Sequence, residues 1–134
     1  MEQSNSYKLL NIFLIESHFK RGDSIDFSNA GFKSNIDINT DSQIHDAILT
    51  TVLKIEFHAG VDGNEQIMAS IAMSGLFETP INYESTIEDF KKINAPAIIF
   101  PFVREHLATI SMKAGITPIL LPPVNFIKLA DDTK

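Results

Sequence analysis

Apolar and polar side chains alternate along much of the first half of the chain, and a period of two predicts β-strands. Four such stretches stand out, at residues 9–19, 36–41, 48–59 and 65–77. In the third stretch, Leu53 and Phe57 share one face and Glu56 lies on the other. A glycine-bearing segment, residues 60–64, separates the third stretch from the fourth and suits a hairpin turn. The pattern predicts four antiparallel strands with one polar face and one covered face.

The opening strand differs from the others because residues 9–15 are apolar on both faces, apart from Asn11. Simple alternation divides its later side chains between two faces, with Phe13, Ile15, Ser17 and Phe19 on one and Glu16, His18 and Lys20 on the other. Apolar surface on both sides of a strand needs cover on both sides. We therefore expect a second subunit to cover this part of the strand.

Helical spacing of apolar residues replaces the alternation in the second half. A short helix is expected to begin at Ser85, with Glu88 as its capping-box partner. A second, longer helix is expected from the N-cap Asn94 to Gly115, with Pro101 bending or loosening its first turns. The apolar stripe of this longer helix is Ile99, Val103, Leu107, Ile110 and Ala114.

An apolar, proline-rich segment follows the long helix, at residues 116–126. Its three prolines forbid a helix and favour an extended path. Six of its eleven residues are nevertheless aliphatic or aromatic. A segment this apolar is expected to be buried in an interface or to line a site for apolar ligands.

Composition bounds the class of protein. The 134 residues fit one domain, residues 1–134, and a hydrophobic fraction of 44% is too high for a disordered chain. A net charge of −6 argues against binding to nucleic acid or to an anionic membrane surface. The longest apolar run, residues 95–103, is shorter than the roughly 18 residues of a membrane span, and the polar start has no signal-peptide core. The expected location is the cytoplasm.

Motifs for catalysis and metal binding are absent from the sequence. There is no cysteine, no glycine-rich phosphate loop and no G-x-S-x-G serine elbow, so no catalytic residue and no cofactor is assigned. His18 and His58 each follow a glutamate at a spacing of two, which makes a cross-strand metal site conceivable. We interpret these pairs as parts of a solvated sheet face and assign no metal.

Two segments of the second half carry a resemblance to a known family. An F-P-aromatic-x-R-E element occupies residues 100–105, and a P-V-N-F element occupies residues 123–126. Residues 52–55 and 74–77 are similar to two strands of the same family, more weakly. Together these segments resemble the SecB family of protein-export chaperones, over roughly residues 7–128.

The resemblance implies an α+β fold in which a four-stranded antiparallel sheet packs with one long helix and a proline-rich crossover loop. It implies assembly as a dimer of dimers, a homotetramer, and an ATP-independent holdase that keeps unfolded precursor polypeptides in apolar grooves. The groove lining implied for this chain is Ile116, Pro118, Ile119, Leu120, Leu121, Val124 and Phe126, with Phe57 and Met112 as further members. Ordinary core or interface packing is the alternative interpretation of each of these residues.

The chain also departs from export-type members of that family. They carry a further helix and an acidic tail after P-V-N-F, whereas this sequence continues for only eight residues after Phe126, so neither is expected here. The export motor SecA docks on an acidic outer sheet face in export-type members. Glu16 matches one of those acids, but Ser70 and Lys20 stand at two other positions.

Three functions therefore remain open. The first is a general holdase for export clients, with or without docking on SecA. The second is a SecB-like chaperone dedicated to one partner, such as the antitoxin of a toxin–antitoxin pair. The third is a ligand-binding or enzymatic α+β domain, which would require a closed pocket with convergent polar groups.

Overall fold

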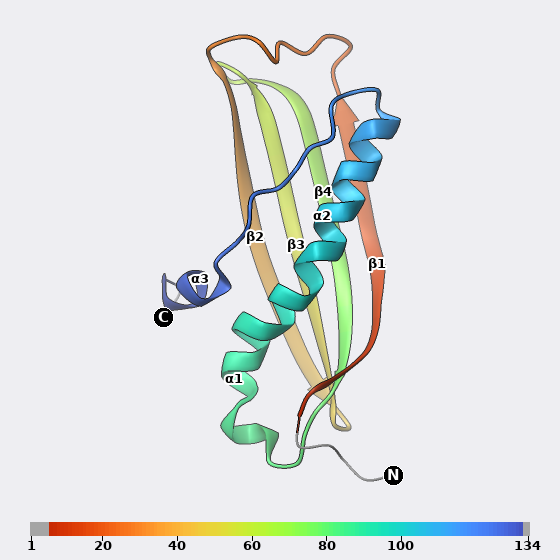
Figure 1. Ribbon diagram of the computed structural model, residues 1–134, viewed down its shortest axis with the longest axis vertical. Helices are drawn as coiled ribbons and strands as arrows, with labels where there is room; N and C mark the ends of the chain where they lie inside the picture. Colours follow the sequence, from red (N-terminus) through yellow and green to blue (C-terminus); the bar gives the residue numbers. More distant parts are fainter. Residues whose placement is uncertain (1–5, 133–134) are drawn as a thin grey trace.

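The computed structural model describes residues 6–132, in which one long helix crosses a four-stranded antiparallel sheet (Figure 1). The strands are β1 (Lys8–Arg21), β2 (Phe32–His45), β3 (Ile48–Val61) and β4 (Asn64–Glu78). Their order in the sheet is β1-β4-β3-β2, because hairpins join β2 to β3 and β3 to β4, while a long connection carries β1 to the far edge. This is a Greek-key arrangement. The α+β fold class predicted from the sequence is confirmed.

The hydrophobic core lies between the helix and one face of the sheet, here called the inner face. On β3, Leu49, Leu53 and Ile55 are buried on that face, whereas Lys54 and Glu56 on the outer face are partly exposed. On β4 the inner-face side chains are Ile67, Ala69, Ile71, Met73 and Phe77, all buried. The alternation predicted for these two strands is confirmed.

Strand β1 breaks the simple alternation, and the face predicted for Phe13 is wrong. The pairing of β1 with β4 shifts between Leu14 and Glu16, which leaves Ile15 as the extra residue of a β-bulge. One inserted residue reverses the parity of the side chains before it, as far back as the next bulge at Leu10. Phe13 therefore pairs with Ser74 on the outer face, whereas Ser17 and Phe19 pair with inner-face residues of β4.

The two predicted helices form one continuous helix. Its segments are α1 (Ile87–Asp89), the π-helical turn η2 (Phe90–Asn94) and α2 (Ala95–Lys113), preceded by the 3₁₀ turn η1 (Tyr83–Ser85). Asn94 has helical backbone angles and makes no side-chain cap, so the predicted N-cap is wrong. Ser85 is not an N-cap either, since its hydroxyl donates to the carbonyl oxygen of Asn82. The wide turn, in which Ala95 N–H bonds to the Phe90 carbonyl, precedes Pro96, which has no N–H to donate.

The predicted end of the long helix at Gly115 is confirmed. Gly115 has a φ of +76°, and its N–H bonds to the Met112 carbonyl, while the N–H of Ile116 bonds to the Ser111 carbonyl. These two bonds form a Schellman motif, which favours glycine. Arg21 at the end of β1 donates from Nη1 to the Ala114 carbonyl oxygen at 2.7 Å, so the sheet also caps this helix.

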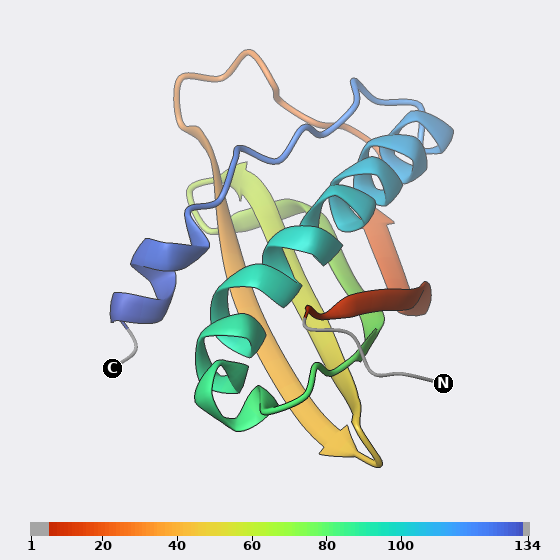
Figure 2. The same ribbon diagram turned by 60° about the horizontal axis from the view of Figure 1, so that its bottom comes forward.

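The chain returns across the inner side of the sheet through an extended segment, residues 116–125, here called the crossover loop (Figure 2). Helix α2 and the crossover loop lie on the same side of the sheet. The loop ends at the helix α3 (Phe126–Asp132), whose Lys128 N–H is capped by the side-chain oxygen of Asn125 at 3.0 Å. The expectation that no helix follows Phe126 is therefore wrong. Among the described residues, no helix has the length and apolar character needed to span a membrane.

Candidate functional site

A hydrogen bond in its middle and buried side chains in it and at its end fix the crossover loop to the body of the protein. The N–H of Ile119 donates to Ser111 Oγ on α2 at 2.9 Å. Leu121 is only 1% exposed, and Phe126 at the end of the loop packs edge-on against Phe100 of the long helix with ring centroids 5.9 Å apart. These contacts join the loop to the hydrophobic core. The loop is therefore a fixed surface.

The nine residues expected to line the groove fall into three groups. Phe57, Leu121 and Phe126 are buried in the core of the single chain. Ile116, Ile119 and Val124 are half-buried and pack against that core. Pro118, Leu120 and Met112 are exposed, with Leu120 at 68% and Met112 at 55%. The peptide-binding role of all nine stays a prediction, and the exposed group offers the most surface to a ligand.

Further exposed apolar residues lie on the two helices that flank the loop. Ile98 and Phe102 of α2 and Ile127 of α3 are exposed, although their side chains are large and apolar. Ile127 has no counterpart in the expected lining. In the sequence, Ile127 is recognisable as the apolar residue that directly follows the P-V-N-F element. It falls at a point where no helix was expected.

The first half of β1 exposes a second apolar surface. Its members lie on both faces of the strand and at its bulges, and comprise Leu9, Leu10, Phe13, Leu14 and Ile15. An apolar patch of this kind on an edge strand is typical of an interaction surface. That another subunit covers it stays a prediction.

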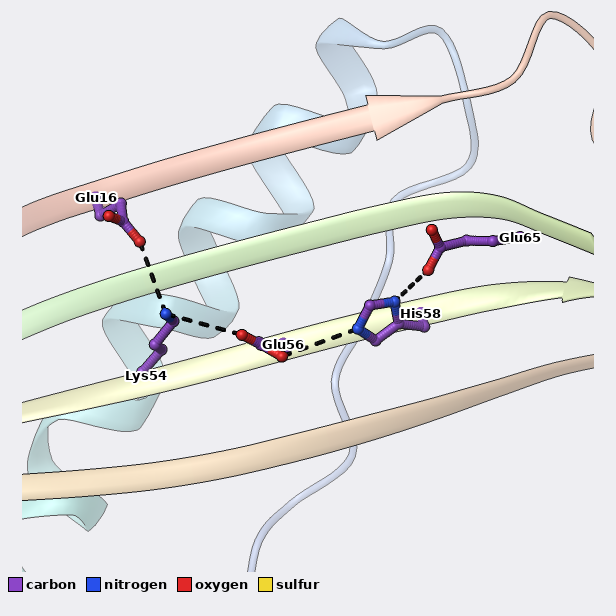
Figure 3. A network of polar contacts seen from close by, with 5 residues as sticks. All are labelled: Glu16, Lys54, Glu56, His58 and Glu65. Carbon is purple, nitrogen blue, oxygen red and sulfur yellow. Dashed lines mark hydrogen bonds and ion pairs between the residues drawn. The ribbon is translucent and has the colours of Figure 1, made fainter.

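The outer face of the sheet carries a chain of polar contacts from β1 to β4 (Figure 3). Lys54 Nζ lies 3.9 Å from Glu16 Oε1 and 3.8 Å from Glu56 Oε1. His58 Nε2 lies 4.0 Å from Glu56 Oε2, and His58 Nδ1 is hydrogen-bonded to Glu65. This bond to Glu65 is the main cause that raises the pKa of His58 above its ordinary value.

The site proposed for motor docking is not a uniformly acidic patch. The carboxylate of Glu16 lies near Lys54 and also 3.8 Å from His18 Nε2. Lys20 and Ser70 lie on the same outer face, since they belong to the outward-facing register of β1 and β4. The surroundings of Glu16 are therefore mixed in charge. Its docking role stays a prediction.

Comparison with known proteins identifies related sequences over most of the chain. The family described as "Preprotein translocase subunit SecB" matches residues 4–134. The protein-export protein SecB of Methylobacillus flagellatus is 27% identical over 88 residues, which are 66% of this chain and 56% of that protein. Uncharacterized protein MJ0357 of Methanocaldococcus jannaschii is 30% identical over 99 residues, 69% of this chain and 64% of the relative. The aligned part of the chain thus spans less than two thirds of both relatives.

A longer alignment exists with the protein-export protein SecB of Cellvibrio japonicus. That relative is 25% identical over 123 residues, which cover 90% of this chain and 74% of the relative.

Solved structures share the fold at low sequence identity. The SecB-like chaperone Rv1957 of Mycobacterium tuberculosis, solved in complex with a ChAD peptide from the Rv1956 HigA1 antitoxin, superposes with a TM-score of 0.78. It is 9% identical, and the match covers 90% of this chain and 91% of that one. A protein of unknown function from Streptococcus agalactiae gives a TM-score of 0.51 at 14% identity, covering 88% of this chain and 98% of the other.

Proposed function

The chain belongs to the SecB family, and we propose that it is an ATP-independent holdase that keeps unfolded precursor polypeptides competent for export. The family match over residues 4–134 carries this proposal. The crossover loop supports it, because an anchored, extended segment that displays Leu120 is suited to an extended apolar client. We further propose that the protein binds its clients without catalysing a reaction and acts in the cytoplasm.

The loop lowers the cost of binding. Its prolines fix φ and its bond to Ser111 holds its middle, so displaying the apolar side chains requires little further ordering. Each client side chain that becomes buried contributes ~1.5–3 kcal/mol before ordering costs. Several such sites on one assembly add through effective concentration, so a long unfolded chain binds better than a short piece of it. Binding by apolar area needs no nucleotide and tolerates many client sequences.

We propose that the protein assembles as a homo-oligomer, as a dimer of dimers. The support is the exposed apolar patch on the first half of β1 together with exposed Ile98 and Phe102 on α2. One chain leaves these surfaces in water, and pairing through the β1 edge and the helix would cover them. Assembly would also bring several crossover loops into reach of one client.

A dedicated chaperone for an antitoxin is the second candidate. Its support is the likeness to Rv1957, which was solved with a peptide from an antitoxin. The mixed charge around Glu16 favours it too, because a motor that docks on an acidic face meets Lys54 and Lys20 there as well as carboxylates. Under this second candidate, docking on SecA is not required.

Dilution of a chemically unfolded polypeptide into buffer tests the proposed function. The protein is expected to suppress light scattering from aggregation at stoichiometric concentration, equally with and without ATP. A folded, assembled protein that leaves aggregation unchanged would contradict the holdase proposal. Affinity capture from native cells then separates the two candidates, since many secretory precursors favour export and one small antitoxin favours the dedicated role.

A further inference from the structure

A β-bulge in β4 brings a second carboxylate beside His58. Ile67 and the odd-numbered residues after it lie on the inner face, and this alternation would also place Glu65 there. The pairing shifts between Ala59 and Gly60, however, so that Gly60 pairs with Glu65 and Gln66 becomes the extra residue. Bulges are known to redirect side chains in this way. The result is that Glu65 shares the outer face with His58 (Figure 3).

Gly60 makes this bulge possible. A Cβ atom at position 60 would lie 2.0 Å from the backbone oxygen of Asn64. No side chain fits at that distance, so the close approach of β3 and β4 depends on glycine. The position of Glu65 is therefore built into the hairpin.

The hydrogen bond with Glu65 sets the direction in which His58 offers a lone pair. An ionised carboxylate only accepts hydrogen bonds, so His58 Nδ1 carries the proton and the neutral ring has its lone pair on Nε2. Nε2 lies 4.0 Å from Glu56 Oε2. A carboxylate that fixes the tautomer of a histidine is the usual second partner of a metal-binding imidazole.

A third group completes the cluster from the edge strand. Asp37 of β2 is directly opposite Glu56 of β3 in the register of the sheet. One ligand atom each from Asp37, Glu56 and His58 can be chosen so that all three lie within 4.8 Å of one another. Like charges directly opposite each other are unfavourable in a sheet, and Lys54 approaches only the other oxygen of Glu56, at 3.8 Å. A cation between the three groups would remove that repulsion.

We propose that Asp37, Glu56 and His58 bind a divalent transition-metal ion such as Zn²⁺, and that Glu65 orients His58. One imidazole nitrogen and two carboxylate oxygens form a donor set that suits zinc, at about 2.0–2.2 Å from the ion. Closing the cluster around an ion needs movements of about 1 Å or less, which partly exposed side chains can make. Asp37 is exposed, and Glu56 and His58 are partly exposed, so water can complete the coordination.

The chain contains its own control for this site. His18 also follows a glutamate at a spacing of two, and its Nε2 lies 3.8 Å from Glu16 Oε2. The nearest charged partner on the other side of Glu16 is Lys54, however, and not a second carboxylate. Among the described residues, the grouping of three potential metal ligands is found at His58 and not at His18. Sequence spacing alone does not distinguish these two histidines.

Calorimetric titration of the full chain with Zn²⁺ in chelator-free buffer tests the proposal. One ion per chain is expected, with an increase in melting temperature that EDTA reverses. His58→Gln and Asp37→Asn should each weaken binding at least tenfold, and Glu65→Gln should weaken it about 10–100-fold through loss of orientation. His18→Gln should bind zinc as the parent does.

Three results would overturn the proposal. The first is that the folded parent chain binds no zinc at about 100 µM Zn²⁺. The second is that His58→Gln and Asp37→Asn both bind zinc with the affinity of the parent. The third is that His18→Gln loses zinc binding. Far-UV circular dichroism of each variant checks that the fold is retained. Asp37→Asn is a conservative substitution and is expected to retain it. Glu56, His58 and Glu65 lie on the face of the sheet opposite to α2 and the crossover loop, which lie behind the sheet in Figure 3. Zinc binding is therefore testable separately from client binding.

Discussion

Ser111 Oγ accepts a 2.9 Å hydrogen bond from the backbone N–H of Ile119, which fixes the middle of the crossover loop to the last turns of α2. The same hydroxyl donates to the Ala108 carbonyl oxygen at 2.9 Å, so its orientation is set. Successive side chains of an extended segment point in opposite directions. Leu121 consequently enters the core at 1% exposure, while Leu120 faces outward at 68%.

Replacement of Ser111 by alanine should loosen the loop. Ser111 is fully buried, and the variant leaves the N–H of Ile119 without its acceptor. We expect a loss of about 1–3 kcal/mol in the free energy of unfolding and faster hydrogen exchange at the Ile119 amide. Thr109→Ala is the control, because the Thr109 hydroxyl bonds only to the side chain of Glu105. Equal exchange rates at Ile119 in parent and Ser111→Ala would contradict the role assigned to this bond.

Gly75 sets how closely the long helix approaches the sheet. A Cβ atom there would lie 2.9 Å from Cδ1 of Ile99 on α2 and 3.0 Å from the ring of Phe77. Gly75→Ala should therefore lower the free energy of unfolding by about 1–3 kcal/mol, measured by urea titration. Gly22→Ala is the control, since the nearest atom to its Cβ would be 3.6 Å away. If Gly75→Ala is as stable as Gly22→Ala, Ile99 and Phe77 can move aside without cost, and the prediction is wrong.

Local sequence pattern predicted the elements of this fold better than their junctions. Alternation located all four strands, but the bulges at Ile15 and Gln66 depend on how a partner strand pairs, which one strand does not encode. Asn94 has the composition of an N-cap, yet the helix continues through it. The turn before it is held by tertiary contacts of Phe90. Its ring stacks on that of Tyr7 with centroids 3.7 Å apart, and it packs edge-on against Phe77 with centroids 5.2 Å apart.

The candidate site was predictable as a segment and not residue by residue. Prolines and aliphatic side chains located the loop in the sequence, whereas Leu120 and Leu121 look identical there. The bond from Ile119 to Ser111 decides which of the two is buried, and that contact joins positions on two different elements. The carboxylate of Asp37 near His58 is likewise a consequence of sheet register.

Assembly should depend on the apolar half of β1. Leu10 is exposed at a β-bulge, so Leu10→Asp is compatible with the isolated fold. Burying an unpaired charge in an interface costs about 3–5 kcal/mol, so the variant should form smaller species in light scattering coupled to gel filtration. Ile44→Asp, an exposed apolar position on the opposite edge strand, is the control. A parent chain that is monomeric at micromolar concentration, or Leu10→Asp with the parental mass, would exclude an interface here.

Client binding should depend on Leu120 more than on any other residue of the crossover loop. Leu120 is its most exposed large apolar side chain. Serine at this position removes the binding free energy that burial of the leucine contributes, about 1.5–3 kcal/mol per contact. Because 1.4 kcal/mol is a factor of ten, Leu120→Ser should bind an unfolded client at least about tenfold more weakly. The fold should be unchanged, since Leu120 is solvent-exposed in the single chain. Affinity is measured by fluorescence anisotropy of a labelled, permanently unfolded polypeptide.

Two further variants separate binding from packing. Ile81→Ser removes a similar exposed side chain from the connection after β4 and should leave client affinity unchanged. Leu121→Ser removes a buried side chain and should lower the free energy of unfolding by about 2–5 kcal/mol, so it does not report on the groove directly. If Leu120→Ser keeps its circular dichroism spectrum and its assembly mass, yet binds the client as tightly as the parent, the crossover loop is packing and the groove lies elsewhere.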